Sequence, residues 1–210
     1  MKVLVIGDSC LDKYVRGTCE RLSPEFPVPV LKLEDERCVT TSPGMAANVT
    51  ANLAAFGCDV DLVTHPENII KTRFVDERTG HHLLRVDAEN EVTPFYRKTI
   101  APGQEFDHRN YDCVVISDYN KGFLTDADIQ WIRKVYQGPV FLDTKKQDLA
   151  QFEGCIVKIN QEERDRATSL CSNLIVTLGK DGATHGGQFY SAPAVKLYDV
   201  CGAGDTFMAT

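Results

Sequence analysis

The chain has 210 residues, of which 43% are hydrophobic and 25% are charged, and this composition is ordinary for a globular protein. The formal net charge of −7 argues against a general nucleic-acid or anionic-membrane surface. Any binding of phosphate must therefore be local, built from backbone N–H groups and a few cations. The length suits one sizeable domain with an appendage.

The N-terminal segment and the cysteines indicate a cytoplasmic protein. The apolar run before Gly7 is too short for the core of a signal peptide, and no later run approaches a membrane span. The eight cysteines form no C-x-x-C pair, so neither a zinc knuckle nor a redox motif is predicted. We expect most of them to be reduced and partly buried, with Cys201, beside a predicted helix N-terminus, as the reactive exception.

The chain begins with a strand and a small layer of further strands. Residues 2–6 form a β-branched run that fits a buried parallel strand. Asp8 and Asp12 follow it, at the sheet edge where ligands gather in open α/β folds. The next segments have no helix between them and are expected to form a small antiparallel layer, at residues 12–18, 27–33 and 37–41.

An alanine-rich helix follows this layer. It is predicted over residues 44–57, with a glycine at its C-terminal stop. Asn48 and Asn52 lie four residues apart on one face of it, as solvated side chains or as groups that face a sugar. The pattern then predicts a strand over 58–64 and a hairpin over 70–76 and 81–87 that joins the small layer.

From residue 112 the chain alternates strands with a helix, which is typical of an α/β fold. The helix is predicted over 125–137, and Thr125 and Asp128 have the spacing of a capping box. Each strand ends on polar or glycine residues at one common edge. The predicted strands are 112–117, 139–143, 155–159 and 173–178.

The last residues combine a glycine-flanked turn with a carboxylate. Gly202 and Gly204 let the backbone point successive N–H groups into one concavity before a helix begins near Asp205. A carboxylate beside an anion-binding turn would repel the ligand unless it acts on a proton. We therefore interpret Asp205 as a general base for phosphoryl transfer to a hydroxyl group.

Two other glycine motifs do not fit this segment. A P-loop requires a lysine after its last glycine, and none follows Gly204. A dinucleotide fingerprint requires a third glycine, where Phe207 stands. An ordinary helix N-terminus, with Asp205 favourably placed in the helix dipole, is the alternative that these residues alone leave open.

A series of short motifs runs along the chain in a fixed order. They are Gly7-Asp8, residues 11–14, residues 21–30, residues 43–49, residues 117–122, Asn160-x-x-Glu163, residues 176–179 and residues 198–206. In this order they resemble the ribokinase/PfkB family of carbohydrate kinases. The run Ser23-Pro24-Glu25-Phe26-Pro27-Val28-Pro29-Val30 is similar to that of the family's kinases of D-glycero-β-D-manno-heptose 7-phosphate. The resemblance covers essentially the whole chain.

The resemblance implies catalytic and sugar-binding roles at the two ends of the chain. Asp205 falls on the family's catalytic base, and its anion hole falls on Gly202, Ala203 and Gly204. The sugar-binding positions fall on Asp12, Gly44 and Asn48. Met45 departs from the pattern, because it stands where the family usually has a second glycine.

The resemblance also implies sites for ATP, Mg²⁺ and a second phosphate. Asn160 and Glu163 match a motif that orders Mg²⁺ and its waters, and hard oxygen ligands suit that ion, although an N-cap is the alternative for such a pair. Thr177 and Gly179, with Asn160, are expected to hold ATP. The candidates for the distal phosphate of the substrate are Lys145, Lys121 and Arg21.

The implied fold is α/β: a ribokinase-like, doubly wound, mostly parallel sheet with a small β-sheet lid. One kinase domain over residues 1–210 is expected, with lid strands from about 12–41 and 70–87. Relatives continue past Thr210 with helices that complete the adenine pocket, so the domain is expected to be C-terminally shortened.

The implied activity is ATP- and Mg²⁺-dependent phosphorylation of a sugar phosphate. Heptose 7-phosphate would give the 1,7-bisphosphate, a precursor of ADP-heptose for lipopolysaccharide. A homodimer through the lid is expected, and no nucleic-acid or membrane partner. The alternatives are a kinase of another sugar or nucleoside in the same family, and a shortened, non-catalytic relative that binds sugar phosphate.

Overall fold

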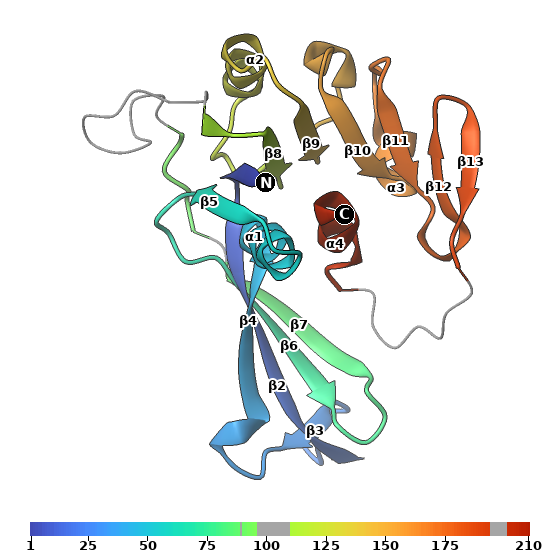
Figure 1. Cartoon of the computed structure of the whole chain (residues 1–210). Helices are drawn as coiled ribbons and strands as arrows, with labels where there is room; N and C mark the ends of the chain where they lie inside the picture. Colours follow the sequence, from blue (N-terminus) through green and yellow to red (C-terminus); the bar gives the residue numbers. More distant parts are fainter. Residues whose placement is uncertain (89, 96–109, 194–200) are drawn as a thin grey trace.

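The computed structural model describes residues 1–88, 90–95, 110–193 and 201–210. These residues form a large sheet of eight strands and a small sheet of five strands that extends away from it (Figure 1). Tyr198, Asp199 and Val200, which belong to the last sequence motif, lie outside the described residues.

The large sheet is parallel except at one edge. Its strand order is β13-β12-β11-β10-β9-β8-β1-β5, and β12 and β13 are the antiparallel strands. Since the parallel strands all run the same way, their carboxyl ends meet at one edge, as predicted. The strands are β1 (Lys2–Gly7), β5 (Asp59–Val63), β8 (Cys113–Asp118), β9 (Val140–Thr144), β10 (Ile156–Asn160), β11 (Leu174–Thr177), β12 (Gly182–His185) and β13 (Gln188–Ser191).

Helices cover both faces of the large sheet, so its central strands are buried on both sides. In β1, Leu4 and Ile6 pack in one hydrophobic cluster with residues of α2, whereas Val3 and Val5 pack in a second cluster with residues of α1 and α4. This alternation follows from the period of two along a strand. The helices are α1 (Ala46–Ala55), α2 (Asp126–Val135), α3 (Gln161–Arg166) and α4 (Ala203–Ala209), with 3₁₀ turns η1 (Glu36–Cys38), η3 (Leu149–Phe152) and η4 (Gly179–Asp181).

The small sheet is built around β2, a strand of 14 residues that follows β1 after Asp8 alone. β2 pairs antiparallel with β3 and with β4, as the sequence predicts for these three segments. β6 joins β2 in parallel and forms an antiparallel pair with β7, so the complete sheet is mixed. Its strands are β2 (Ser9–Leu22), β3 (Pro29–Lys32), β4 (Val39–Met45), β6 (Ile70–Asp76) and β7 (His82–Ala88).

Two local features differ from the sequence prediction. Gly44 and Met45 end strand β4 instead of beginning the helix, because the pairing with β2 continues to Met45. The hairpin of β12 and β13 was not predicted. Gly186 and Gly187 form its two-residue turn with φ of 56° and 78°, the left-handed conformation that such a turn requires. None of the helices in the described part of the chain is long and apolar enough to cross a membrane.

The predicted capping box at the start of α2 is confirmed. The Thr125 hydroxyl accepts the Asp128 N–H, and the Asp128 carboxylate accepts the Thr125 N–H. We expect Thr125→Ala to lower the free energy of unfolding by about 1 kcal/mol, because it removes the acceptor for one helix-terminal N–H group. Urea unfolding followed by circular dichroism measures this loss. Thr125→Ser keeps the hydroxyl and should retain most of the stability; an equal loss in both variants would contradict the capping role.

The cysteines differ in exposure and therefore in reactivity. Burial raises the pKa of Cys10 and of Cys155 to about 11 each, whereas Cys201 is exposed. Because the thiolate is the nucleophile, a thiol of this pKa is only about 0.1% ionised at pH 8. We expect iodoacetamide to modify Cys201 well before Cys10 and Cys155 in the folded protein, as measured by mass spectrometry of tryptic peptides. The difference should vanish in urea. Equal labelling rates in the native protein would contradict the prediction that Cys201 is the more reactive thiol.

Candidate active site

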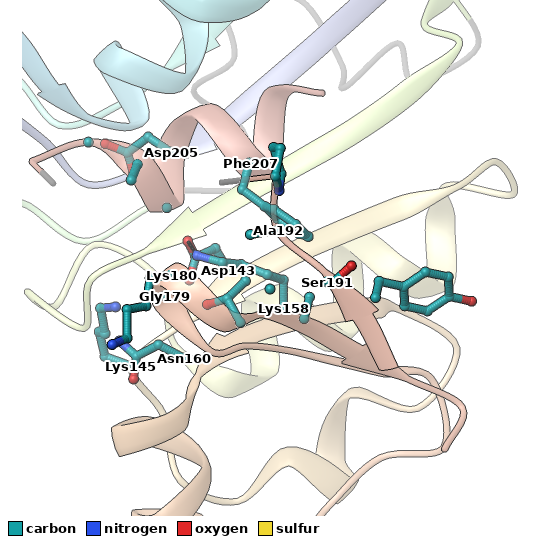
Figure 2. Close-up of a pocket in the computed structure, with 18 of the residues that line it drawn as sticks. Asp143, Lys145, Lys158, Asn160, Gly179, Lys180, Ser191, Ala192, Asp205 and Phe207 are labelled. Carbon is teal, nitrogen blue, oxygen red and sulfur yellow. Dashed lines mark hydrogen bonds and ion pairs between the residues drawn. The ribbon is translucent and has the colours of Figure 1, made fainter. Parts of the chain in front are cut away.

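A cavity of about 860 Å³ lies between α4 and the carboxyl edge of the large sheet. Figure 2 shows Asp205 and Phe207 on α4 at one side of it, and Asp143, Lys158 and Lys145 on the sheet side. The cavity is polar around the lysines and lined by small and aromatic residues elsewhere. Its other lining residues include Tyr119, Asn160, Thr177, Gly179, Ala183, Tyr190, Ala192, Pro193, Gly202, Ala203 and Gly204.

Asp205 lies in the first turn of α4 and is 5% exposed. Asn48 on α1 donates from Nδ2 to Oδ2 of Asp205 at 2.8 Å, and the Tyr119 hydroxyl donates to Oδ1 at 2.9 Å. Burial and the charge of Asp205 raise the pKa of Tyr119, so its phenol stays protonated and remains a donor. The carboxylate is therefore held by residues from both the beginning and the middle of the chain.

The glycines before Asp205 lie close to side chains from α1 and β10. Gly202 has φ of 75°, and a Cβ atom there would lie 2.8 Å from Asn48 Nδ2. A Cβ atom on Gly204 would lie 3.0 Å from the Nζ of Lys158. The N–H groups of a first helical turn have no acceptor within the helix. The turn thus brings unpaired N–H groups and a lysine ammonium together beside the carboxylate.

Lys158 and Asp143 form a buried ion pair that the sequence analysis did not identify as part of the site. The Nζ of Lys158 lies 2.7 Å from Oδ2 of Asp143, and the two residues are 5% and 4% exposed. Burial raises the pKa of Asp143, and the charges of Lys158 and Lys145 oppose this shift. A signal was available: Lys158 interrupts the apolar run of β10, and a charge in a buried strand needs a partner or a ligand.

The sugar-binding candidates Asp12 and Gly44 lie on β2 and β4. Arg73 on β6 forms an ion pair with Asp12 through Nη1. A Cβ atom on Gly44 would lie 2.4 Å from Asp12 Oδ2 and 2.5 Å from Cys10 Sγ, so only glycine leaves both groups in place. Burial raises the pKa of the Cys10 thiol, and the charges of Asp12 and Asp205 act in the same direction.

Asn160 and Glu163 form a capping box at the start of α3. Asn160 Oδ1 accepts the Glu163 N–H at 2.9 Å, and Glu163 Oε2 accepts the Asn160 N–H at 2.8 Å. The Nζ of Lys145 pairs with Oε1 of Glu163 and lies 5.1 Å from the centre of the Tyr119 ring. The described residues contain no group of three or more His, Cys, Asp or Glu side chains suited to a metal ion. The capping box realises the N-cap alternative for this pair.

The remaining candidates lie at three different places. Thr177 and Gly179, at the end of β11, line the cavity. Lys121, in the loop after β8, is half-buried, and its N–H lies 3.4 Å from Asp8 Oδ2. Arg21 is exposed on the distal part of β2, nine residues beyond Asp12 and so roughly 30 Å away along the strand. The structure does not bring Arg21 to the cavity.

Known proteins resemble this chain in sequence and in fold. No family model matches the chain. A bifunctional protein HldE from Hydrogenovibrio crunogenus is 32% identical over 261 residues, covering 100% of this chain and 54% of its own length. HldE proteins from Nitratiruptor sp. and Caulobacter vibrioides are 31% and 30% identical, each over 99% of the chain and 55% and 54% of their own lengths. The chain thus spans about half the length of these curated relatives.

The fold is that of solved carbohydrate kinases. Phosphofructokinase-2 from Escherichia coli, in complex with substrates and products, has a TM-score of 0.67 at 15% identity and covers 100% of this chain and 84% of its own. Ribokinase from Arabidopsis thaliana, complexed with ribose and ATP, has a TM-score of 0.63 at 16% identity, with 99% and 83% covered. The resemblance noted from the motifs is confirmed: the chain has the fold of these carbohydrate kinases and is similar in sequence to the HldE proteins over its whole length.

Proposed function

We propose that this chain is a kinase that transfers the γ-phosphoryl group of ATP to the anomeric hydroxyl of a sugar phosphate, heptose 7-phosphate. The observation that carries the proposal is the buried carboxylate of Asp205, held by Asn48 and Tyr119 beside the glycine turn. The fold shared with a ribokinase and a phosphofructokinase supports a carbohydrate as the acceptor. The heptose rests on the run at residues 23–30, which is similar to that of heptose 7-phosphate kinases.

The proposed chemistry needs one proton acceptor and several positive groups. Asp205 takes the proton of the sugar hydroxyl as its oxygen bonds to the γ-phosphorus and the bond to the ADP oxygen breaks. The N–H groups of Gly202, Ala203 and Gly204 and the ammonium of Lys158 offset the charge on the transferred oxygens. Asn48 and Tyr119 keep the carboxylate in one orientation, so little reorganisation accompanies the transfer.

ATP and Mg²⁺ are proposed to occupy the cavity on the sheet side of α4. Thr177, Gly179 and Asn160 line its wall, and the Arabidopsis ribokinase was crystallised with ATP. Asp143 Oδ1 is buried without a hydrogen-bond donor among the described residues, so an oxygen ligand is available there. Hard oxygens suit Mg²⁺, which would shield the phosphate charges when bound, held by Glu163 and Asn160 through ordered waters.

The sugar is proposed to bind on the other side of Asp205, against Asp12, Gly44 and Asn48. Asp12 supplies a carboxylate for a sugar hydroxyl, and Arg73 fixes its orientation. A homodimer through the small sheet remains part of the proposal. Its support is the exposed apolar side chains of Leu11, Leu84 and Val86 on the face away from Asp12.

Replacement of the proposed base tests the reaction directly. We expect Asp205→Asn to lower kcat by at least about 10³-fold, because the amide cannot accept the proton, while ATP affinity changes little. A coupled assay of ADP release with heptose 7-phosphate measures kcat, and calorimetry measures ATP binding. Asp61→Asn, on the exposed strand β5, is the matched control and should keep full activity. Turnover in Asp205→Asn near the wild-type value would remove Asp205 from this role.

The phenol of Tyr119 is expected to affect kcat by orienting the carboxylate of Asp205. We expect Tyr119→Phe to lower kcat about 10-fold, the effect of one lost hydrogen bond to a charged group, with KM for ATP unchanged. Tyr111→Phe is the control, because it removes a phenol that contacts Asp61 at the surface. If both variants keep the wild-type kcat, the contact between Tyr119 and Asp205 has no catalytic role.

A further inference from the structure

One face of the small sheet carries a cluster of charges next to the candidate active site. The register places Lys71 on β6 between Asp12 on β2 and Asp87 on β7. Arg73 and Arg85 are cross-strand partners two residues further along β6 and β7. Because side chains two apart on a strand share a face, these three cations and two carboxylates lie on one side of the sheet.

The two carboxylates are already occupied by the two arginines. Arg73 pairs with Asp12, and Arg85 donates from Nε and Nη2 to the oxygens of Asp87 at 2.7 and 2.6 Å. Lys71 is the cation that remains. Across the described ranges, no side chain accepts a hydrogen bond from its ammonium or forms an ion pair with it.

Lys71 is nevertheless almost completely removed from solvent. It is 9% exposed, and its Nζ lies 5.2 Å from the centre of the Tyr119 ring. Burial lowers the pKa of Lys71, which reflects the cost of keeping this charge out of water. Asp12 and Asp87 favour the charged form of Lys71, but neither forms an ion pair with its ammonium, so the desolvation is only partly compensated.

The position of Lys71 relative to Asp205 suits a ligand that carries a reacting hydroxyl at one end and an anionic group at the other. The ring of Tyr119 separates them: Lys71 lies over the ring, and the hydroxyl of the same ring donates to Asp205 at 2.9 Å. These two contacts keep the ammonium and the carboxylate within the reach of one phosphorylated sugar. A sugar that presents its reacting hydroxyl to Asp205 would bring a group at its far end to Lys71.

We propose that Lys71 binds the phosphate that the acceptor sugar already carries, and so selects phosphorylated over unphosphorylated sugars. This inference rests on the proposed kinase function. Lys121, a candidate from the sequence in the loop after β8, is proposed as a second cation; its backbone N–H lies 3.4 Å from Asp8 Oδ2. Two ammonium groups match the double charge of a phosphomonoester better than that of a single carboxylate.

The structure favours Lys71 over two of the candidates taken from the sequence. The ammonium of Lys145 is engaged by Glu163, at the side of the cavity assigned to the nucleotide. Arg21 is exposed at the distal end of β2. Lys71 gave no sequence signal, because an isolated lysine in an alternating strand is most often a solvated side chain.

The test compares Lys71→Met with Lys32→Met in the full 210-residue chain. Methionine keeps the length of the side chain and removes the charge, and Lys32 is an exposed lysine of the same sheet. Isothermal titration measures the Kd of D-glycero-D-manno-heptose 7-phosphate and of the unphosphorylated heptose. For Lys71→Met we expect a 10- to 100-fold loss of affinity for the phosphorylated sugar and a change below 2-fold for the other. Lys32→Met should match the wild type for both.

Thermal unfolding without ligand separates binding from a structural role. Lys71→Met should have a Tm equal to or above that of the wild type, because it removes an unpaired buried charge. A clear fall in Tm, an equal loss for both sugars, or unchanged affinity for the phosphorylated sugar would each overturn the proposal. These measurements need no turnover. If the wild-type protein binds the sugar phosphate but transfers no phosphate, the kinase function is rejected, and the binding data still decide the role of Lys71.

Discussion

The contact between Asn48 and Asp205 joins the two ends of the chain, and the candidate active site depends on it. Asn48 lies on α1 and Asp205 on α4, 157 residues apart, and their side chains are 2.8 Å apart. The two helices lie side by side on one face of the large sheet (Figure 1), where Val49 and Met208 share a hydrophobic cluster. Packing therefore fixes the proposed base relative to the proposed sugar-binding residues, and a shift of about 1 Å between the helices would misalign both.

The cations of the site differ in how far they are neutralised, although the protein as a whole is acidic. Lys158 is paired with Asp143, and Lys145 is paired with Glu163. Each carboxylate holds its lysine in place and partly neutralises the positive charge of the ammonium. Lys71 forms no such ion pair within the described residues, so its ammonium is available to a bound anion. The paired lysines suit positioning of a phosphoryl group in transit, whereas the unpaired one suits affinity for an anion that stays bound.

The sequence was sufficient for the parallel strands of the large sheet, for α1 and α2 and for the turn before Asp205, because periodicity, capping residues and glycine spacing are local signals. It was not sufficient for Lys158 or Lys71, because their importance comes from strand register, which places distant residues side by side. The same reason explains why the sequence could not place Arg21. Its motif resembles that of the family, but its position on β2 places it far from the cavity. The β12–β13 hairpin could have been predicted from the sequence, because Gly186-Gly187 is a recognisable signal for a two-residue turn.

The junction between the two sheets links the position of the small sheet to the proposed base. Asp8 lies between β1 and β2, and Met45 lies between β4 and α1; the Ala46 N–H donates to the Asp8 carbonyl at 2.9 Å, which ties the two junctions together. The Asp8 carboxylate accepts the Tyr119 N–H at 2.8 Å, and Tyr119 in turn holds Asp205. Met45 has φ of 58° and is 3% exposed, so its buried side chain fixes a backbone conformation that a glycine would leave mobile. A movement of the small sheet that bends this junction must therefore act on Tyr119, and through it on the orientation of the carboxylate.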